Sequence, residues 1–277
     1  MGKAGTRVAI LSIEGTNCDE ELATCFRRLG VSAEIIDLKQ FSGDVEDAGD
    51  SRRLADYQIL MIPGGFSAGD YVRGGAIMAA RIRSSIGEDL ADFVHSSGHL
   101  VGGICNGFQV LVELGMLPGG ESMEATTPQA ALATNSSAHF ECRPTYCRWE
   151  GGNFLPMADV EEGGVYYFPS AHGEGKFTLS GEKGATLKEL EDNGQILFRW
   201  VDPTGNRAGY PWNPNGSEGD IAGVTNLEGN VFGLMPHPER AFTLLQYPDW
   251  TRTGIGDGHG DGYYFFESIV QYVESHI

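Results

Sequence analysis

The chain has 277 residues, and its 38 acidic and 19 basic side chains give it a formal net charge of −19. Such a surface repels phosphate backbones, which argues against nucleic-acid binding and against an electrostatic membrane anchor. No apolar run approaches the roughly 20 residues needed to cross a bilayer, and the first residues lack the apolar core of a signal peptide. The five cysteines are an odd number, typical of reduced thiols, so we expect a cytoplasmic protein without nucleic-acid or membrane partners.

The first half of the chain alternates short apolar runs with helical patterns. Strands are predicted for the apolar runs at residues 8–13, 33–38, 58–62 and 100–104. Helices are predicted between and after them, at residues 19–29, 88–96 and 106–114. Apolar strands joined by helices indicate a parallel sheet that is covered on both faces.

The second half is more irregular. Residues 120–163 are polar with strand-like pieces near 140–148, and residues 203–219 are rich in Gly, Pro and Asn, which predicts an ordered loop. An apolar strand at 231–235 and an amphipathic helix at 263–275 follow. No linker divides the chain, so we expect one domain spanning residues 1–277, an α/β fold with a mostly parallel central sheet and helices on both faces.

The strongest local signal is Gly103-Ile104-Cys105-Asn106-Gly107, which follows an apolar strand and precedes a helix. This is the nucleophile-elbow pattern with cysteine in place of serine. Neighbours two positions away crowd together at such a sharp turn, which explains the glycines. The positive end of the following helix favours the thiolate, and the N–H of Asn106 can face a developing oxyanion. The alternative is a buried structural cysteine in a glycine-rich turn.

A base that could serve this thiol stands in Met235-Pro236-His237-Pro238-Glu239-Arg240, directly after an apolar strand. Each proline disfavours helix for the residue before it, which predicts an extended His237. Glu239, two residues on, can then hold the imidazole in one tautomer, as the third member of a triad does. The alternative is a histidine at a strand end beside a solvated acid. Together with the elbow, the pattern predicts a Cys105, His237, Glu239 triad.

Pro63-Gly64-Gly65 ends another predicted strand, at the edge where ligands gather in open parallel sheets. Backbone N–H groups of Gly64 and Gly65 could complete an oxyanion hole. A phosphate cradle is disfavoured because the usual glycine and lysine motifs are missing, and a plain turn stays as the alternative. His139, Cys142 and Cys147 lack the paired spacing of common zinc sites, so no metal is expected.

These motifs resemble those of class I, or triad, glutamine amidotransferases. Further stretches narrow the resemblance to the glutaminase subunits of phosphoribosylformylglycinamidine synthase: Gly15-Thr16-Asn17-Cys18-Asp19, Gly64-Gly65-Phe66-Ser67 with Gly69-Asp70-Tyr71, Asn135 with Ser137, Phe140-Glu141 and Arg143, Ala171-His172-Gly173-Glu174-Gly175, and Asn213-Pro214-Asn215-Gly216-Ser217. The resemblance spans about residues 7–275 and implies a flavodoxin-like α/β fold.

The resemblance also implies a role for each matching residue. Cys105 would attack the carboxamide of L-glutamine, His237 would protonate the departing ammonia and then activate water, and Glu239 would orient His237. Gly65 and Asn106 would supply the oxyanion N–H groups. The residues expected to contact glutamine are Gln109, Gly64, Asn135, Ser137 and Phe140. His172 and Glu174 are expected near the substrate or the partner-facing side.

The ammonia would pass to a separate large synthetase subunit, because this chain has no ATP motif. By the same resemblance, that partner uses ATP and Mg²⁺ to make formylglycinamidine ribonucleotide, and no cofactor is bound by this chain. Whether a small third subunit bridges the two is left open. Two other hypotheses remain: an amidotransferase that serves another synthetase, and a non-catalytic binding subunit in which the elbow is only architecture.

Overall fold

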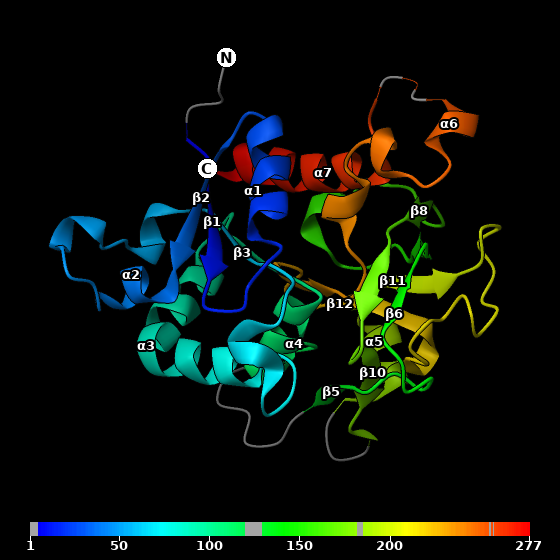
Figure 1. The fold of residues 1–277 in the computed structure, drawn as a ribbon, viewed down its shortest axis with the longest axis horizontal. Helices are drawn as coiled ribbons and strands as arrows, with labels where there is room; N and C mark the ends of the chain where they lie inside the picture. Colours follow the sequence, from blue (N-terminus) through cyan, green and yellow to red (C-terminus); the bar gives the residue numbers. More distant parts are fainter. Residues whose placement is uncertain (1–4, 120–128, 182–184, 255, 257) are drawn as a thin grey trace.

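The computed structural model describes residues 5–119, 129–181, 185–254, 256 and 258–277, and its centre is a nine-stranded mixed sheet (Figure 1). Five neighbouring strands are parallel: β2 (Ser32–Asp37), β1 (Arg7–Ser12), β3 (Ile59–Ile62), β4 (Leu100–Ile104) and β13 (Val231–Leu234). The sheet continues antiparallel through β12 (Ile221–Thr225), β11 (Ile196–Val201), β7 (Tyr146–Trp149) and β8 (Val165–Tyr167). Two small sheets pair β5 (Ala130–Ala133) with β10 (Lys176–Leu179) and β6 (Glu141–Arg143) with β9 (Ser170–His172).

Helices cover both faces of the sheet. The α-helices are α1 (Asp19–Arg28), α2 (Leu38–Ser42), α3 (Ala76–His95), α4 (Asn106–Glu113), α5 (Leu187–Asp192), α6 (Trp250–Thr253) and α7 (Asp261–His276). Short 3-10 helices are η1 (Ala48–Asp50), η2 (Leu54–Asp56), η3 (Ser67–Asp70), η4 (Leu155–Met157), η6 (Glu218–Asp220), η7 (Pro238–Ala241) and η8 (Leu244–Gln246). Figure 1 shows α1 and α7 on one side of the sheet and α3 and α4 on the other. Phe26 of α1 meets Phe266 of α7 edge-on, with ring centroids 5.3 Å apart.

The α/β fold with helices on both faces is confirmed, and the five predicted strands are the five parallel ones. The strand at Leu100–Ile104 has the predicted bounds, and the other four are displaced or shortened by one residue at an end. Every residue of β3 and β4 is buried, as expected for central parallel strands. Among the described residues, none of the helices has the length and apolar character that a membrane span requires.

Three of the differences between the structure and the sequence predictions have a local cause. Helix α3 begins at Ala76 rather than at residue 88, because Gly75, at φ 78°, ends the preceding turn and the alanine-rich stretch after it is already helical. The strand-like run at 140–148 is two strands: Pro144, which has no N–H, separates β6 from β7, and only β7 joins the main sheet. Strands β11 and β12 were not predicted, because Arg199 interrupts the apolar run of β11 and β12 has only two large apolar side chains, Ile221 and Val224.

The predicted loop at 203–219 lies between β11 and β12 and is irregular apart from the 3-10 turn that begins at Glu218. The parallel arrangement has a direct consequence for function. The carboxyl ends of β1, β3, β4 and β13 meet at one edge of the sheet, and the loops that follow them carry Cys18, Gly64, Cys105 and His237.

Candidate active site

Cys105 joins β4 to α4 in a strained backbone conformation, with φ 51° and ψ −104°. A positive φ is unfavourable for a residue with a side chain and is typical of functional turns. The turn is sharp enough that a Cβ at Gly107 would lie 1.9 Å from the carbonyl oxygen of Ile62, and one at Gly103 would lie 2.5 Å from that of Gly107. The two glycines of the elbow therefore have a steric cause, and the thiol is held at the N-terminus of α4.

His237 reaches the thiol because β13 pairs with β4 in parallel. The N–H of Cys105 donates to the carbonyl of Leu234 at 2.7 Å, so the residues after β13 run beside the elbow. The N–H of His237 donates to the carbonyl of Pro169 at 2.8 Å, which fixes the backbone on its other side. Two segments more than 130 positions apart in the sequence are thereby brought to one point.

His237 and Glu239 form a buried pair, with Nδ1 2.5 Å from Oε1. His237 is not helical, with φ −107° and ψ 88°, but it is not a regular extended residue, and the chain turns into η7 at Pro238. The two side chains therefore meet across the first turn of a 3-10 helix and not along an extended strand, which corrects the geometric reason given from the sequence. The bond to Nδ1 leaves Nε2 as the ring atom for chemistry.

The electrostatics of His237 favour the protonated ring. Burial lowers the pKa of His237, but the charges of Glu239 and of the Cys105 thiolate, together with hydrogen bonds to both, raise it to about 10. Among the described residues, Nε2 of His237 has no partner at standard hydrogen-bond distance and angle, so it can exchange a proton with a reacting group. The Cys105 sulfur is buried and lies 3.6 Å from the carbonyl oxygen of Ala171. This arrangement suits an imidazolium beside a thiolate nucleophile.

The two backbone N–H groups predicted for an oxyanion hole belong to Asn106 and Gly65. Asn106 is the first residue of α4, so its N–H has no acceptor within the helix. Gly65 has φ 140°, a conformation that a residue with a side chain rarely adopts, and a Cβ there would lie 2.8 Å from the nitrogen of Asn17. Gly64 lies against His237, because a Cβ there would come within 2.9 Å of the imidazole ring.

The side chains of Asn106 and Gln109 are engaged with each other. Asn106 Nδ2 donates to Gln109 Oε1 at 2.8 Å and to Asp70 at 3.2 Å, and Gln109 Nε2 donates to the carbonyl of Glu174 at 2.7 Å. The carboxylate of Glu174 in turn accepts from the N–H of Gly74 at 2.9 Å. This network joins the elbow to two loops beside it, so Gln109 is placed next to the candidate site and not on an outer surface.

The other predicted substrate residues are arranged differently. Asn135 is buried, and its amide binds the carbonyls of His139 and His172 and the N–H of Gly175, so it supports the loop after β9. The ring of Phe140 is 52% exposed and lies 6.5 Å from that of Phe66, the residue after Gly65.

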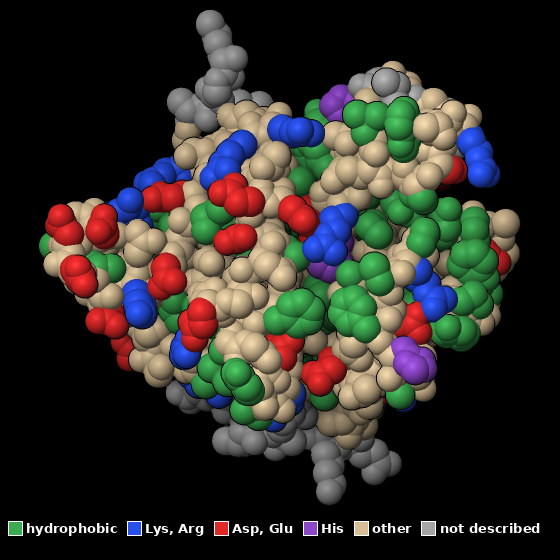
Figure 2. Space-filling view, viewed as in Figure 1, with side chains coloured by type: hydrophobic (Ala, Val, Ile, Leu, Met, Phe, Trp, Pro, Cys, Tyr) green, Lys and Arg blue, Asp and Glu red, His purple; other side chains and the backbone are tan. Residues whose placement is uncertain are grey.

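Ser137, with its Oγ 3.4 Å from the N–H of His139, lies on the same outer loop as Phe140. Figure 2 shows charged and hydrophobic side chains gathered around a hollow at the middle of this face.

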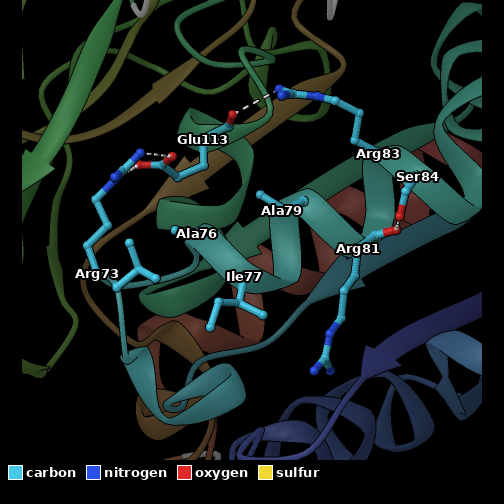
Figure 3. A pocket seen from close by; sticks show the side chains of 10 residues that line it. Arg73, Ala76, Ile77, Ala79, Arg81, Arg83, Ser84 and Glu113 are labelled. Carbon is cyan, nitrogen blue, oxygen red and sulfur yellow. Dashed lines mark hydrogen bonds and ion pairs between the residues drawn. The ribbon is translucent and has the colours of Figure 1, made fainter.

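A separate pocket lies along α3 and α4 (Figure 3). None of the candidate residues lines it, and its arginines already have partners. Arg73 pairs with Glu113 at 2.6 Å, Arg83 donates to the carbonyl of Glu113 at 3.1 Å, and Arg81 pairs with Glu14 at 2.6 Å. Arg73 and Arg81 are therefore paired with carboxylates, and Arg83 is bonded to a backbone carbonyl.

Three side chains around the site, those of Cys18, Arg240 and Asp70, were not selected from the sequence as candidates for it. Cys18 and Arg240 touch each other, with Nη2 3.0 Å from Sγ, and Asp70 belongs to the network of Asn106 and Gln109. Glu174, which was expected near the substrate or the partner-facing side, belongs to the same network. Cys18 lay in a motif noted for its resemblance, but nothing in the sequence placed the loop after β1 against His237. That contact depends on the order of the strands in the sheet.

The comparisons with known proteins agree with this geometry. The model of the CobB/CobQ-like glutamine amidotransferase domain family matches residues 5–273, and the chain belongs to this family. Over 277 residues it is 48% identical to phosphoribosylformylglycinamidine synthase subunit PurQ of Archaeoglobus fulgidus, covering 99% of both chains. It is 43% identical over 241 residues to the PurQ subunit of Picrophilus torridus, covering 87% of this chain and 89% of that one.

Among solved structures, a chain in the PurLQS structure from Thermotoga maritima superposes with a TM-score of 0.70. The two are 30% identical, and the match covers 97% of this chain and 99% of that chain. The resemblance drawn from the sequence motifs is confirmed by these findings.

Glu239→Gln tests the pairing at Nδ1. Glutamine keeps the shape of the side chain but removes the charge that raises the pKa of His237, and it can stabilise the wrong tautomer. We expect kcat for glutamine hydrolysis to fall by about 100-fold with a small change in KM. Steady-state kinetics of glutamate release measure this, and an unchanged kcat would show that Glu239 does not orient the base.

Proposed function

We propose that this chain is the glutaminase subunit of a phosphoribosylformylglycinamidine synthase. The observation that carries the proposal is the strained Cys105 held beside the buried His237–Glu239 pair at the carboxyl edge of the sheet. The full-length likeness to PurQ subunits supports the particular synthetase over others. The alternative of another synthetase has no observation in its favour.

The proposed reaction begins with the Cys105 thiolate, which attacks the side-chain carbonyl carbon of L-glutamine. The N–H groups of Gly65 and Asn106 stabilise the oxyanion of the tetrahedral intermediate. The C–N bond then breaks, His237 donates its proton to the leaving nitrogen, and ammonia departs from a thioester. Neutral His237 next takes a proton from water, which attacks the thioester and releases glutamate, and the thiolate and the imidazolium are restored.

The proposed partners follow from the product. Ammonia is useful only if a second enzyme consumes it, and we propose a large synthetase subunit that spends ATP, with Mg²⁺, to convert formylglycinamide ribonucleotide to the amidine. Gln109, Gly64, Asn135, Ser137 and Phe140 are proposed as the glutamine-binding set. The chain would act as one domain in the cytoplasm, where its five free cysteines stay reduced.

Reconstitution with the synthetase tests the proposal. The purified complex should form formylglycinamidine ribonucleotide from either glutamine or ammonium, whereas the synthetase alone should use ammonium only. Adding a small third subunit in a parallel series shows whether the complex needs one. Synthesis from ammonium but never from glutamine, with a complex that forms normally, would contradict the proposal.

A second measurement distinguishes the hypothesis of a catalytic subunit from that of a non-catalytic binding subunit. A glutamine analogue with an electrophilic diazoketone group should label Cys105 once per chain, as read by mass spectrometry after proteolysis. The absence of a label on Cys105 supports the non-catalytic hypothesis.

A further inference from the structure

A second buried thiol lies against the His237–Glu239 pair. Cys18 occupies the N-cap position of α1, and its sulfur, a ring nitrogen of His237 and a carboxylate oxygen of Glu239 all lie within 4.8 Å of one another. All three side chains are buried. Gly64 stands between the parts of this cluster, since a Cβ there would lie 3.2 Å from Cys18 Sγ and 2.9 Å from the His237 ring. The missing side chain at Gly64 leaves the thiol and the imidazole open to each other.

The cluster contains polar atoms that the proposed hydrolysis does not account for. Within the described part of the chain, Nε2 of His237 and Oε2 of Glu239 have no hydrogen-bond partner, and each side chain is 2% exposed. The Cys18 thiol has no part in the reaction, and it donates to Asn17 Oδ1 at 3.3 Å and accepts from Arg240 at 3.0 Å. Nε2 of His237 is assigned to proton transfer with the reacting groups and Oε1 of Glu239 holds the ring, but Oε2 of Glu239 has neither a role in the reaction nor a partner. Buried polar atoms without a partner are rare in native proteins and point to a bound group.

We propose that Cys18, His237 and Glu239 bind one thiophilic divalent cation, with Zn²⁺ as the best fit. Thiolate sulfur, imidazole nitrogen and carboxylate oxygen are the protein ligands of zinc, whereas Mg²⁺ and Ca²⁺ take oxygen ligands. Tetrahedral zinc separates its ligand atoms by about 3.3–3.8 Å, so side-chain shifts of about 1 Å close the site. Binding releases one proton from the Cys18 thiol and one from the imidazolium, and the thiolate and carboxylate balance both charges of the cation.

Arg240 carries a positive charge beside this position, and that charge repels a bound cation. Its Nη2 donates to Cys18 Sγ at 3.0 Å, while its Nε pairs with Glu21 at 2.9 Å. Because Arg240 and Glu21 are both partly exposed, the guanidinium can turn from the sulfur and keep its ion pair. The bound metal occupies the imidazole and its carboxylate, so it stops glutamine hydrolysis; this consequence rests on the proposed function.

The metal site is tested in the full chain carrying Cys105→Ala, which removes the nucleophilic thiol. Co²⁺ is the probe, because a thiolate–cobalt bond absorbs strongly in the near ultraviolet, and Zn²⁺ is then added to displace it. We expect one equivalent of bound Co²⁺ with this absorption. Adding Cys18→Ser should remove the absorption and weaken binding by about 100-fold. Adding Cys25→Ser should change neither, although Cys25 is also buried and lies 3.8 Å from the carbonyl oxygen of Glu239.

Absorption that survives Cys18→Ser, or none in the Cys105→Ala chain, overturns the site. Since that chain has no nucleophile, this result is independent of whether the protein hydrolyses glutamine. If Cys18→Ser does not fold, X-ray absorption of the zinc-loaded Cys105→Ala chain decides: one sulfur neighbour supports the site and none overturns it. In the wild-type chain, hydrolysis that continues at saturating Zn²⁺ contradicts the inhibitory consequence alone.

Discussion

Cys105→Ala should lower glutamine-dependent synthesis by the reconstituted complex by about 10,000-fold or more, while ammonium-dependent synthesis stays near its wild-type rate. The thioester on Cys105 cannot form without its sulfur. Ammonium bypasses the whole reaction of this chain and needs only the synthetase. Product formation with each nitrogen source, measured at matched complex concentration, gives the two rates.

The control for this variant is the removal of a different cysteine thiol. Cys142→Ala removes an exposed cysteine of β6, so both nitrogen sources should support wild-type rates. Equal loss of both activities in Cys105→Ala would mean that Cys105 maintains the fold or the complex and is not the nucleophile. Size-exclusion chromatography of the complex distinguishes these two structural causes.

The parts of the site that could be predicted from the sequence are those set by local chemistry. The elbow can be recognised from five consecutive residues, because a sharp strand-to-helix turn needs glycine two positions on either side of Cys105. His237 was found because prolines flank it and an acid follows two residues later. These signals depend only on residues that are neighbours in the chain, so they can be recognised without knowledge of the fold.

The parts that could not be predicted depend on the order of strands. Cys18 comes near His237 only because β1 and β13 end at the same edge of the sheet with β3 and β4 between them. Strands β11 and β12 have no clear apolar run, because Arg199 interrupts the first and the second has only two large apolar side chains. Asn135 was selected as a substrate residue on resemblance, and its hydrogen bonds to the loop around His172 could not be read from the sequence.

Gly107→Ala should cause a large loss of stability. The new Cβ would lie 1.9 Å from the carbonyl oxygen of Ile62 and 2.7 Å from its carbon, and both atoms belong to the backbone of β3. Because Gly107 is in the first turn of α4 and β3 is a central strand, neither can move without shifting Cys105 or the oxyanion loop. We expect the free energy of unfolding to fall by about 3 kcal/mol or more, measured by urea denaturation.

Gly87→Ala is the matched control, because it adds the same methyl group to another helix. Gly87 lies within α3, directly after the non-helical Ile86, and outside its chain neighbours and the adjoining helix backbone no atom comes within 4 Å of the Cβ position there. Alanine favours helix over glycine, so this variant should match the wild type or gain up to about 1 kcal/mol. If Gly107→Ala were as stable as Gly87→Ala, this result would show that α4 does not pack as closely against β3 as in the structure. The strained placement of Cys105 would then lose its structural support, since the same contact holds the elbow in its turn.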